Sequence, residues 1–271
     1  MEKMPSVEEM RNLFNINGLV AVVVGAGSGI GQGIAYAFAA NGGKVVCGDI
    51  NKTTLDFTVE RIVASGGDAV GVVVDSTNVE SVRRFRDEAI RRHGGIDALY
   101  ATPGMNVRKR IEGYTYEEFD RVVNLNLKGT FILMKEIGTS IAGNPKGGSI
   151  ILFSSIRNQL VEPGQSVYAA TKAAIVQLAR VQAAELGMKN VRVNALAPGY
   201  VDTPLVAQIK KEPEWYEASR SKNALRRWAT VREIAGPALF LASPAASHIT
   251  GAVIYVDGGW TAVDGRYEPK V

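Results

Sequence analysis

The stretch VVVGAGSGIGQG, residues 22–33, decides the fold of this chain. It begins as a valine run typical of a buried strand and continues into a turn with the spacing G-x-x-x-G-x-G, through Gly25, Gly29 and Gly31. Glycines allow the backbone to turn tightly and approach a phosphate closely, while the N–H groups that open the next helix face the anion. No G-x-G-x-x-G can be drawn through these glycines, which disfavours the commonest dinucleotide fingerprint. The stretch therefore predicts a strand, a phosphate-binding turn and a helix.

Short runs rich in Val and Ile alternate with longer helical patterns along the rest of the chain. Most of the short runs are apolar nearly throughout, as expected for strands buried on both faces of a parallel sheet. Strands are predicted at 19–25, 44–49, 69–75, 96–101, 149–154, 191–197 and 252–257, and helices at 29–41, 53–65, 79–93, 115–141, 167–187 and 231–242. This alternation indicates an α/β fold, a Rossmann-type doubly wound parallel sheet of about seven strands with helices on both faces.

The domain organisation follows from the absence of any linker or repeat. We expect one dinucleotide-binding catalytic domain at 18–271, with a substrate lid near 203–228. Residues 1–17 precede the first strand and are expected to form an appendage. In it Met10, Leu13 and Phe14 could make a short amphipathic helix that packs on the domain or on a neighbour.

Composition narrows the classes of partner. The 271 residues carry a net charge of +4, with scattered cations and no basic run interleaved with aromatics, so no nucleic-acid partner is expected. No apolar run approaches the ~20 residues of a membrane helix, and the first 16 residues lack the apolar region of a signal peptide. The single cysteine, Cys47, excludes an internal disulfide and suits a cytoplasmic location. His93 and His248 are too far apart to suggest a metal site.

An acidic residue ends the second predicted strand. Asp49 lies 24 residues beyond Gly25, where a carboxylate accepts the ribose hydroxyls of NAD and repels the 2′-phosphate of NADP. The sequence therefore predicts NAD as the cofactor. NADP is the less favoured alternative, and it stays open because Lys52 is close enough to offset part of the Asp49 charge. Asp75 closes the third strand at the same edge of the sheet.

Hydroxyl, phenol and amine groups follow in a second cluster. The strand within ILFSSIR ends in Ser154 and Ser155, and Tyr168 and Lys172 lie one helical turn apart. Ser155, Tyr168 and Lys172 at this spacing, behind the glycine turn and the acidic second strand, resemble the classical short-chain dehydrogenase/reductase family. The resemblance covers residues from about 18 to 260. VVNLNLKGTF, APGYVDTP and TGAVIYVDGG are similar to further segments of that family.

The resemblance implies hydride transfer between a nicotinamide and a secondary alcohol or ketone, with catalytic residues Asn126, Ser155, Tyr168 and Lys172. Tyr168 would be the acid/base, Lys172 would tune its charge and hold the ribose, Ser155 would hydrogen-bond the reacting oxygen, and Asn126 would hold a water. A free phenol, with pKa ~10, is a poor base at neutral pH, and a neighbouring ammonium favours the phenolate. The implied cofactor-binding residues are Gly25, Ser28, Gly29, Ile30, Gly31, Asp49, Asp75, Ser76, Gly104, Tyr168, Lys172, Pro198, Gly199, Val201 and Thr203.

Two segments depart from the family pattern. Val24 replaces the usual Thr before the glycine turn, and ATPG at 101–104 replaces Asn-Asn-Ala-Gly after the fourth strand. The resemblance makes these segments hydrogen-bonded neighbours, so both changes fall on one contact. We expect apolar packing of Val24 against the fourth strand to replace it.

Arginines near the predicted catalytic edge suggest the substrate. Arg108 follows the fourth strand and Arg157 stands two residues past Ser155, so we expect an anionic sugar or sugar acid bound partly by these two side chains. The alternative is that these cations are solvated surface residues.

Other activities remain open at this point. The main alternative is an NADP-dependent 3-oxoacyl-thioester reductase, which Asp49 disfavours. A non-catalytic NAD-binding regulator is a further alternative, although Tyr168 and Lys172 are both present. The resemblance also implies a homo-tetramer or homo-dimer assembled through helices 115–141 and 167–187 and the last strand, with the tail 261–271 crossing to a neighbour.

Overall fold

Seven parallel strands form one sheet in the order β3-β2-β1-β4-β5-β6-β7 in the computed structural model, which describes residues 4–263. The strands are β1 (Val20–Val24), β2 (Lys44–Asp49), β3 (Asp68–Val73), β4 (Ala98–Ala101), β5 (Gly148–Phe153), β6 (Val191–Pro198) and β7 (Val253–Val256). All seven predicted strands are present, and their ends differ from the predicted ones by at most two residues. The predicted doubly wound fold is confirmed.

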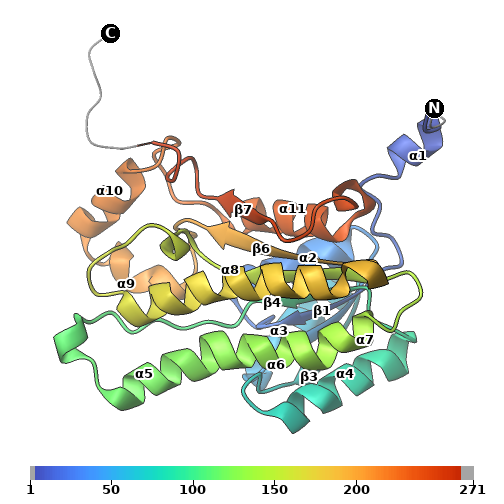
Figure 1. Ribbon diagram of the computed structural model, residues 1–271, viewed down its shortest axis with the longest axis horizontal. Coiled ribbons are helices and arrows are strands. Elements are labelled where there is room, and N and C mark those ends of the chain that lie inside the picture. The colour runs from blue at the N-terminus through green and yellow to red at the C-terminus, as the bar shows by residue number, and fades with distance from the viewer. Residues whose placement is uncertain (1–3, 264–271) are drawn as a thin grey trace.

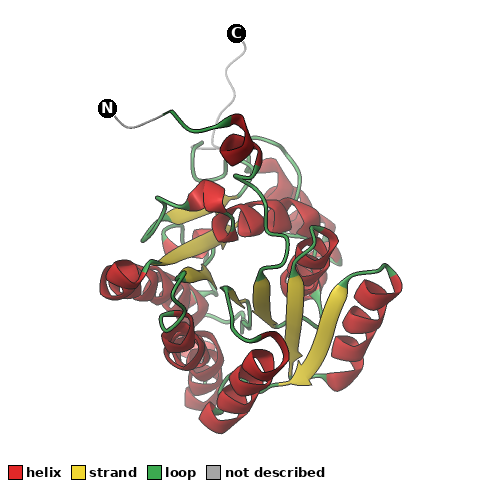
Figure 2. Ribbon diagram, turned by 90° about the vertical axis from the view of Figure 1, so that its right-hand side faces the viewer, coloured by secondary structure: helices red, strands yellow, loops and turns green. Residues whose placement is uncertain are grey.

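Helices cover both faces of this sheet (Figure 2). α2 (Gly29–Ala40), α3 (Lys52–Ala64) and α11 (Val231–Ala242) pack on one face, where Phe38 and Ile234 are fully buried. α4 (Val79–His93), the long helix at 116–141 and α8 (Ser166–Leu186) pack on the other, where Phe85 and Leu133 are fully buried. Each strand of the sheet centre therefore buries both of its faces, which explains its unbroken run of apolar residues.

The helix predicted at 115–141 is continuous but irregular. It consists of α5 (Tyr116–Val123), a π-helical segment η2 (Asn124–Gly129), α6 (Thr130–Leu133), a second π-helical segment η3 (Met134–Gly138) and α7 (Thr139–Ile141). π-Helical turns inside α-helices are frequent at functional sites, because they redirect side chains. The first of them contains Asn126.

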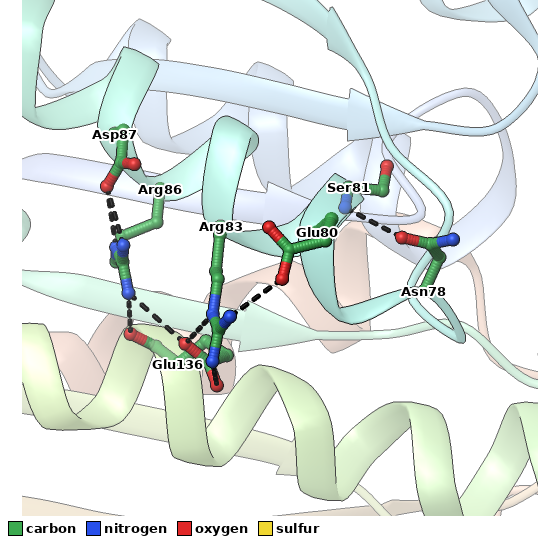
Figure 3. Close-up of polar contacts among 7 residues, drawn as sticks. All are labelled: Asn78, Glu80, Ser81, Arg83, Arg86, Asp87 and Glu136. Atoms are coloured by element: carbon green, nitrogen blue, oxygen red, sulfur yellow. Dashed lines mark hydrogen bonds and ion pairs between the residues drawn. The ribbon is translucent and has the colours of Figure 1, made fainter.

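An ion-pair cluster fixes this long helix to α4 (Figure 3). Glu136, only 8% exposed, accepts hydrogen bonds from Arg83 Nε at 3.0 Å and from Arg86 at 3.2 Å. Both arginines lower the pKa of the Glu136 carboxyl, with Arg83 the larger influence. A nearly buried carboxylate held by two guanidiniums sets the register between the two helices.

The N-terminal segment and the segment expected to be a lid lie towards opposite ends of the strands (Figure 1). Among residues 4–17, the helical part is α1 (Val7–Arg11), which leaves Met10 exposed and ends before Leu13. The Phe14 ring lies 6.3 Å from that of Phe240. Two short helices, α9 (Ala207–Lys210) and α10 (Pro213–Ser221), form the region expected to be a lid. Most of the tail expected to reach a neighbour, from residue 264 onward, lies outside the described residues.

The strand order places a cleft at a defined position. β1 pairs with β2 on one side and with β4 on the other, so the chain reverses its direction of winding between β1 and β4. Ligands of open α/β sheets bind beyond the carboxyl ends of the strands at such a point. The residues that follow β1, β2, β4, β5 and β6 therefore meet at one edge.

Candidate active site

Two adjoining hollows lie at this edge of the sheet, of about 910 Å³ and about 790 Å³. The larger, here called the cofactor hollow, lies over the carboxyl ends of β1, β2 and β3. The smaller, here called the substrate hollow, follows β5 and β6 and the start of α8. Side chains common to both show that they form one continuous cleft: Ile30, Thr102, Gly104, Thr203 and Leu205.

The glycine turn after β1 is a cradle that side chains would fill. A Cβ on Gly31 would lie 2.2 Å from the Gly25 carbonyl oxygen, and one on Gly25 would lie 2.4 Å from Thr102 Oγ1. Gly25 also has φ +87°, in the left-handed region that favours glycine. The turn therefore presents bare backbone to the cofactor hollow, as close approach by a phosphate group requires.

Asp49 lies at the end of β2 with its carboxylate fixed by backbone donors. Oδ2 accepts from the Gly27 N–H at 2.9 Å, and Oδ1 accepts from the Asn51 N–H at 2.9 Å. Lys52, expected to offset the charge of Asp49, instead donates to Asp56 at 2.5 Å. Gly27 was not among the residues predicted from the sequence. In the structure, a Cβ at Gly27 would lie 2.5 Å from Thr54 Oγ1 and 2.8 Å from Asp49 Oδ2, so this position has no room for a side chain.

The contact between β1 and the segment after β4 is polar, which differs from the expected apolar replacement. Thr102 Oγ1 donates to the Val24 carbonyl oxygen at 2.7 Å, and the Thr102 N–H donates to the same oxygen at 3.2 Å. The side chain of Val24 is buried, in the core under α4 and α8. A main-chain acceptor on β1 and a hydroxyl after β4 therefore hold the two segments together.

Ser155, Tyr168 and Lys172 meet in the substrate hollow. Ser155 follows β5 and caps the short helix η4 (Ile156–Asn158), where its hydroxyl accepts from the Arg157 N–H at 3.2 Å. Tyr168 and Lys172 lie one turn apart on α8, with Nζ 5.5 Å from the centre of the phenol ring. Lys172 is 4% exposed, and its Nζ donates to the Phe153 carbonyl at 2.7 Å.

The electrostatics of Tyr168 differ from the sequence argument. Burial raises the pKa of the phenol, and the groups that oppose this rise are the Ser155 hydroxyl, Arg108 and Arg157. Lys172, which was expected to lower the pKa of Tyr168, is not among these groups. Burial in turn lowers the pKa of the Lys172 ammonium to about 8.

Asn126 lies behind the cleft and lines neither hollow. Its Oδ1 accepts from the Met105 N–H at 2.8 Å, and its Nδ2 donates to the Met105 carbonyl at 2.9 Å. This pair of bonds holds the loop after β4, where a Cβ on Gly104 would lie 3.3 Å from Lys172 Nζ. The side chain thus positions Gly104 beside the lysine, while the water-holding role implied for Asn126 stays a prediction.

Both predicted substrate arginines line the substrate hollow, but in different states. Arg108 Nε is buried and has no hydrogen-bond partner among residues 4–263, and the guanidinium lies 5.7 Å from the centre of the Trp215 ring. Arg157, 8% exposed, forms an ion pair with Glu162. The charge of Arg157 is therefore compensated, whereas Arg108 forms no ion pair with any carboxylate among residues 4–263.

The structure brings most of the remaining predicted residues to the cleft. Ser28, Gly29, Ile30, Asp75 and Ser76 line the cofactor hollow, and Pro198, Gly199, Val201 and Thr203 line the substrate hollow. The sequence analysis missed further residues of the substrate hollow, among them Asn106, Gln165 and Tyr200. The sequence could have indicated these three residues only because each has a hydrogen-bonding side chain and lies near the strand ends at which the catalytic residues lie.

Residues 4–263 were also expected to lack a membrane span and a metal site. None of the helices found there is long and apolar enough to cross a membrane. Within the same part of the chain, no group of three or more His, Cys, Asp or Glu side chains is arranged to hold a metal ion.

Comparison with known proteins assigns the family. A family model described as enoyl-(acyl carrier protein) reductase matches residues 25–261. The 3-oxoacyl-(acyl-carrier-protein) reductase of Thermotoga maritima is 33% identical, over 90% of this chain and 98% of its own length. The gluconate 5-dehydrogenase of Gluconobacter oxydans is 32% identical, over 92% of this chain and 97% of its own length.

A solved structure agrees with these relatives. The gluconate 5-dehydrogenase from Burkholderia cenocepacia J2315, in complex with NADP and tartrate, superposes with a TM-score of 0.89 and is 29% identical, covering 93% of this chain and 98% of its own. The chain belongs to the short-chain dehydrogenase/reductase family and is an NAD(P)-dependent oxidoreductase acting on CH–OH groups.

Proposed function

We propose that this enzyme interconverts a secondary alcohol and a ketone of a sugar acid, with NAD as its cofactor. The observation that carries the proposal is Arg108, a guanidinium with an unpartnered buried Nε in the same hollow as Ser155 and Tyr168. A guanidinium is well suited to a carboxylate, because its planar donors match the two oxygens. Gluconate and 2-dehydro-3-deoxy-D-gluconate dehydrogenases among the relatives, and the tartrate in the Burkholderia structure, support a hydroxy acid.

The proton of the reacting hydroxyl is handled by the chain. Tyr168 takes this proton when the alcohol is oxidised and returns it when the ketone is reduced, while Ser155 donates a hydrogen bond to the reacting oxygen. Arg108 and Arg157, which both lower the pKa of the Tyr168 phenol, favour the phenolate that the oxidation needs. The nicotinamide, when bound, supplies or accepts the hydride.

The cofactor hollow has groups that fit a dinucleotide. The bare backbone between Gly25 and Gly31 would hold the pyrophosphate, and Asp49 would accept the ribose hydroxyls. Lys172 Nζ, beside Gly104, would hold the ribose next to the nicotinamide. Although the Burkholderia relative binds NADP, the fixed carboxylate of Asp49 and the pairing of Lys52 with Asp56 support NAD for this chain.

The cofactor preference is tested by replacing Asp49 with Asn, which keeps the shape and removes the charge. We expect the ratio of kcat/KM with NADP to that with NAD to rise on the order of 100-fold, because one charge repelling a phosphate across a few Å is removed. The measurement is initial-rate kinetics with each cofactor. Asp68→Asn, at the exposed start of β3 and away from the cleft, is the control and should leave the ratio unchanged. A ratio that favours NADP in the wild type would contradict the proposal.

The substrate is tested by following NADH formation with neutral sugars, sugar acids and simple secondary alcohols. We expect turnover of a sugar acid, and in Arg108→Leu a rise in its KM on the order of 100-fold, since one charge-assisted pair is lost in a buried site. KM for a neutral polyol substrate should change little in the same variant. Arg110→Leu, an exposed neighbour of like charge, is the matched control.

The competing activity is reduction of a 3-oxoacyl thioester, which the Thermotoga relative supports. It would appear in the same experiment as oxidation of NADPH by a 3-oxoacyl thioester, with no turnover of sugar acids. In that case Arg108→Leu would not discriminate between charged and neutral small substrates, and the sugar-acid proposal would fail.

A further inference from the structure

Glu162 joins several side chains around the substrate hollow. Its carboxylate accepts from the Arg157 guanidinium, from Gln165 Nε2 and from the Tyr200 hydroxyl, the last at 3.0 Å. Gln165 in turn accepts from Asn106 Nδ2 at 2.9 Å. Apart from Glu162, each of these residues lines the substrate hollow. One carboxylate therefore organises one wall of the hollow.

The Arg157 guanidinium is held between aromatic rings as well as by Glu162. It lies 5.8 Å from the centre of the Tyr200 ring and 5.7 Å from that of Trp260. Its side chain is 7% exposed and that of Glu162 is 23% exposed, so solvent screens the pair weakly. A guanidinium fixed in this way has little freedom to turn towards a substrate.

The charge balance of the hollow follows from this pairing. Three cationic side chains line it: Arg108, Arg157 and Lys172. The Lys172 ammonium lies beside Gly104 and donates to the Phe153 carbonyl. The charge of Arg157 is neutralised by Glu162. Among the guanidiniums that line the hollow, Arg108 is the one for which the described residues include no ion pair.

We propose that Glu162 is a specificity-determining residue: by neutralising Arg157 it leaves Arg108 as the one guanidinium that residues 4–263 offer to an anion in the hollow, so the hollow selects a singly charged hydroxy acid over a doubly charged one. This inference rests on the proposed function and deepens it. Without Glu162, two guanidiniums would face the hollow, and a second carboxylate or a phosphate on the substrate would find a partner. Selection of this kind works by withholding a contact from the wrong ligand.

The test compares the binding of two hydroxy acids that differ by one charge. Affinities for gluconate and for the dicarboxylate glucarate are measured by calorimetry in the presence of NADH, with which a hydroxy acid cannot react, for the wild type and for Glu162→Gln. Glutamine keeps an oxygen that can accept from Tyr200 and Arg157, so the wall is retained while the charge is lost. We expect wild type to prefer gluconate, and the ratio of glucarate affinity to gluconate affinity to rise on the order of tenfold in the variant.

A double variant separates charge selection from a structural effect. In Glu162→Gln combined with Arg157→Gln, the unmasked guanidinium is removed, and the ratio should return to within about twofold of the wild-type value. Glu118→Gln, which breaks the ion pair with Lys109 outside the hollow, is the matched control and should leave the ratio unchanged. A ratio that does not rise in Glu162→Gln, or that stays raised in the double variant, overturns the proposal.

The ratio of tartrate affinity to glycerate affinity compares a dicarboxylate with a monocarboxylate in the same way. Its measurement does not depend on whether the enzyme turns over a sugar acid. If the wild type turns over no sugar acid but the tartrate-to-glycerate ratio responds to the variants as described, the proposed substrate is wrong and the charge selection stands. If sugar acids are turned over and neither ratio responds, the proposed function stands and the role of Glu162 is refuted. Absence of binding by either pair of acids to every variant also refutes it.

Discussion

Replacing Tyr168 with Phe is expected to lower kcat by about 10³-fold while leaving the affinity for NAD within about twofold of the wild type. The phenylalanine keeps the ring, which lies 5.5 Å from Lys172 Nζ, and removes only the hydroxyl, whose pKa the neighbouring Ser155 hydroxyl lowers. A positioned acid/base contributes about 10²–10⁴-fold to a rate, and the present reaction cannot proceed without moving the alcohol proton. Single-turnover kinetics and fluorescence titration of cofactor measure the two quantities separately.

The control for this substitution is Tyr255→Phe. Tyr255 lies on β7, and its hydroxyl contacts Asn158 and Gln159 at 2.8 Å and 2.7 Å without lining the substrate hollow. Loss of this phenol should change kcat by less than about twofold. If Tyr168→Phe kept more than a tenth of the wild-type kcat, another group would have to be the acid/base.

The strands and most helices could be predicted from the sequence because this fold buries its sheet on both faces. β2, α4 and α11 begin and end at the predicted residues, since each is bounded by glycine, by a capping residue or by a change from apolar to polar sequence. The glycine turn and the pair Tyr168 and Lys172 were likewise recognisable, because each is a local pattern. The spacing of residues close together in the sequence is thus enough to predict the fold and the family.

Contacts between distant segments could not be predicted in this way. Thr102 and Val24 are 78 residues apart, and nothing in either segment alone indicates a hydrogen bond between them. The ion pair of Arg157 with Glu162 spans a loop, where no helical spacing relates the two side chains. The pairing of Arg157 with Glu162, and with it the net charge of the substrate hollow, can therefore be seen only in the tertiary structure.

The direction of the Tyr168 pKa shift was also beyond the sequence. The sequence argument counted the charge of Lys172 one turn away, but it had no measure of burial, which raises the pKa of the phenol. Burial acts on Lys172 as well and lowers the pKa of its ammonium to about 8. The same loss of solvent therefore moves the two pKa values apart, because it disfavours the anionic phenolate and the cationic ammonium alike.

The buried ammonium of Lys172 makes the free energy of unfolding depend on pH, and a Lys172→Met variant would lack this dependence. The ordinary pKa of 10.5 applies to the unfolded chain, and the folded value is about 8, so the unfolded state binds this proton more tightly. Below pH 8 both states are protonated and the folded wild type bears the full cost of the buried charge, roughly 3 kcal/mol. Between pH 8 and 10.5 the folded state loses the proton first, so the stability of the wild type rises with pH by that amount relative to a variant that cannot titrate.

Lys172→Met is therefore expected to lower kcat by at least about 100-fold and to change stability in a pH-dependent way. At pH 7 the gain from removing the charge is opposed by about 1–3 kcal/mol, because the Phe153 carbonyl loses its donor and is left buried. The variant should thus be close to the wild type in free energy of unfolding at pH 7, and less stable by roughly 3 kcal/mol more at pH 10.5. Denaturant unfolding at both pH values measures this difference, and Lys146→Met, at an exposed lysine, should show none of it. A difference between the Lys172→Met variant and wild type that does not vary with pH would mean that the lysine keeps its ordinary pKa, and the cleft around it would then have to be open to water.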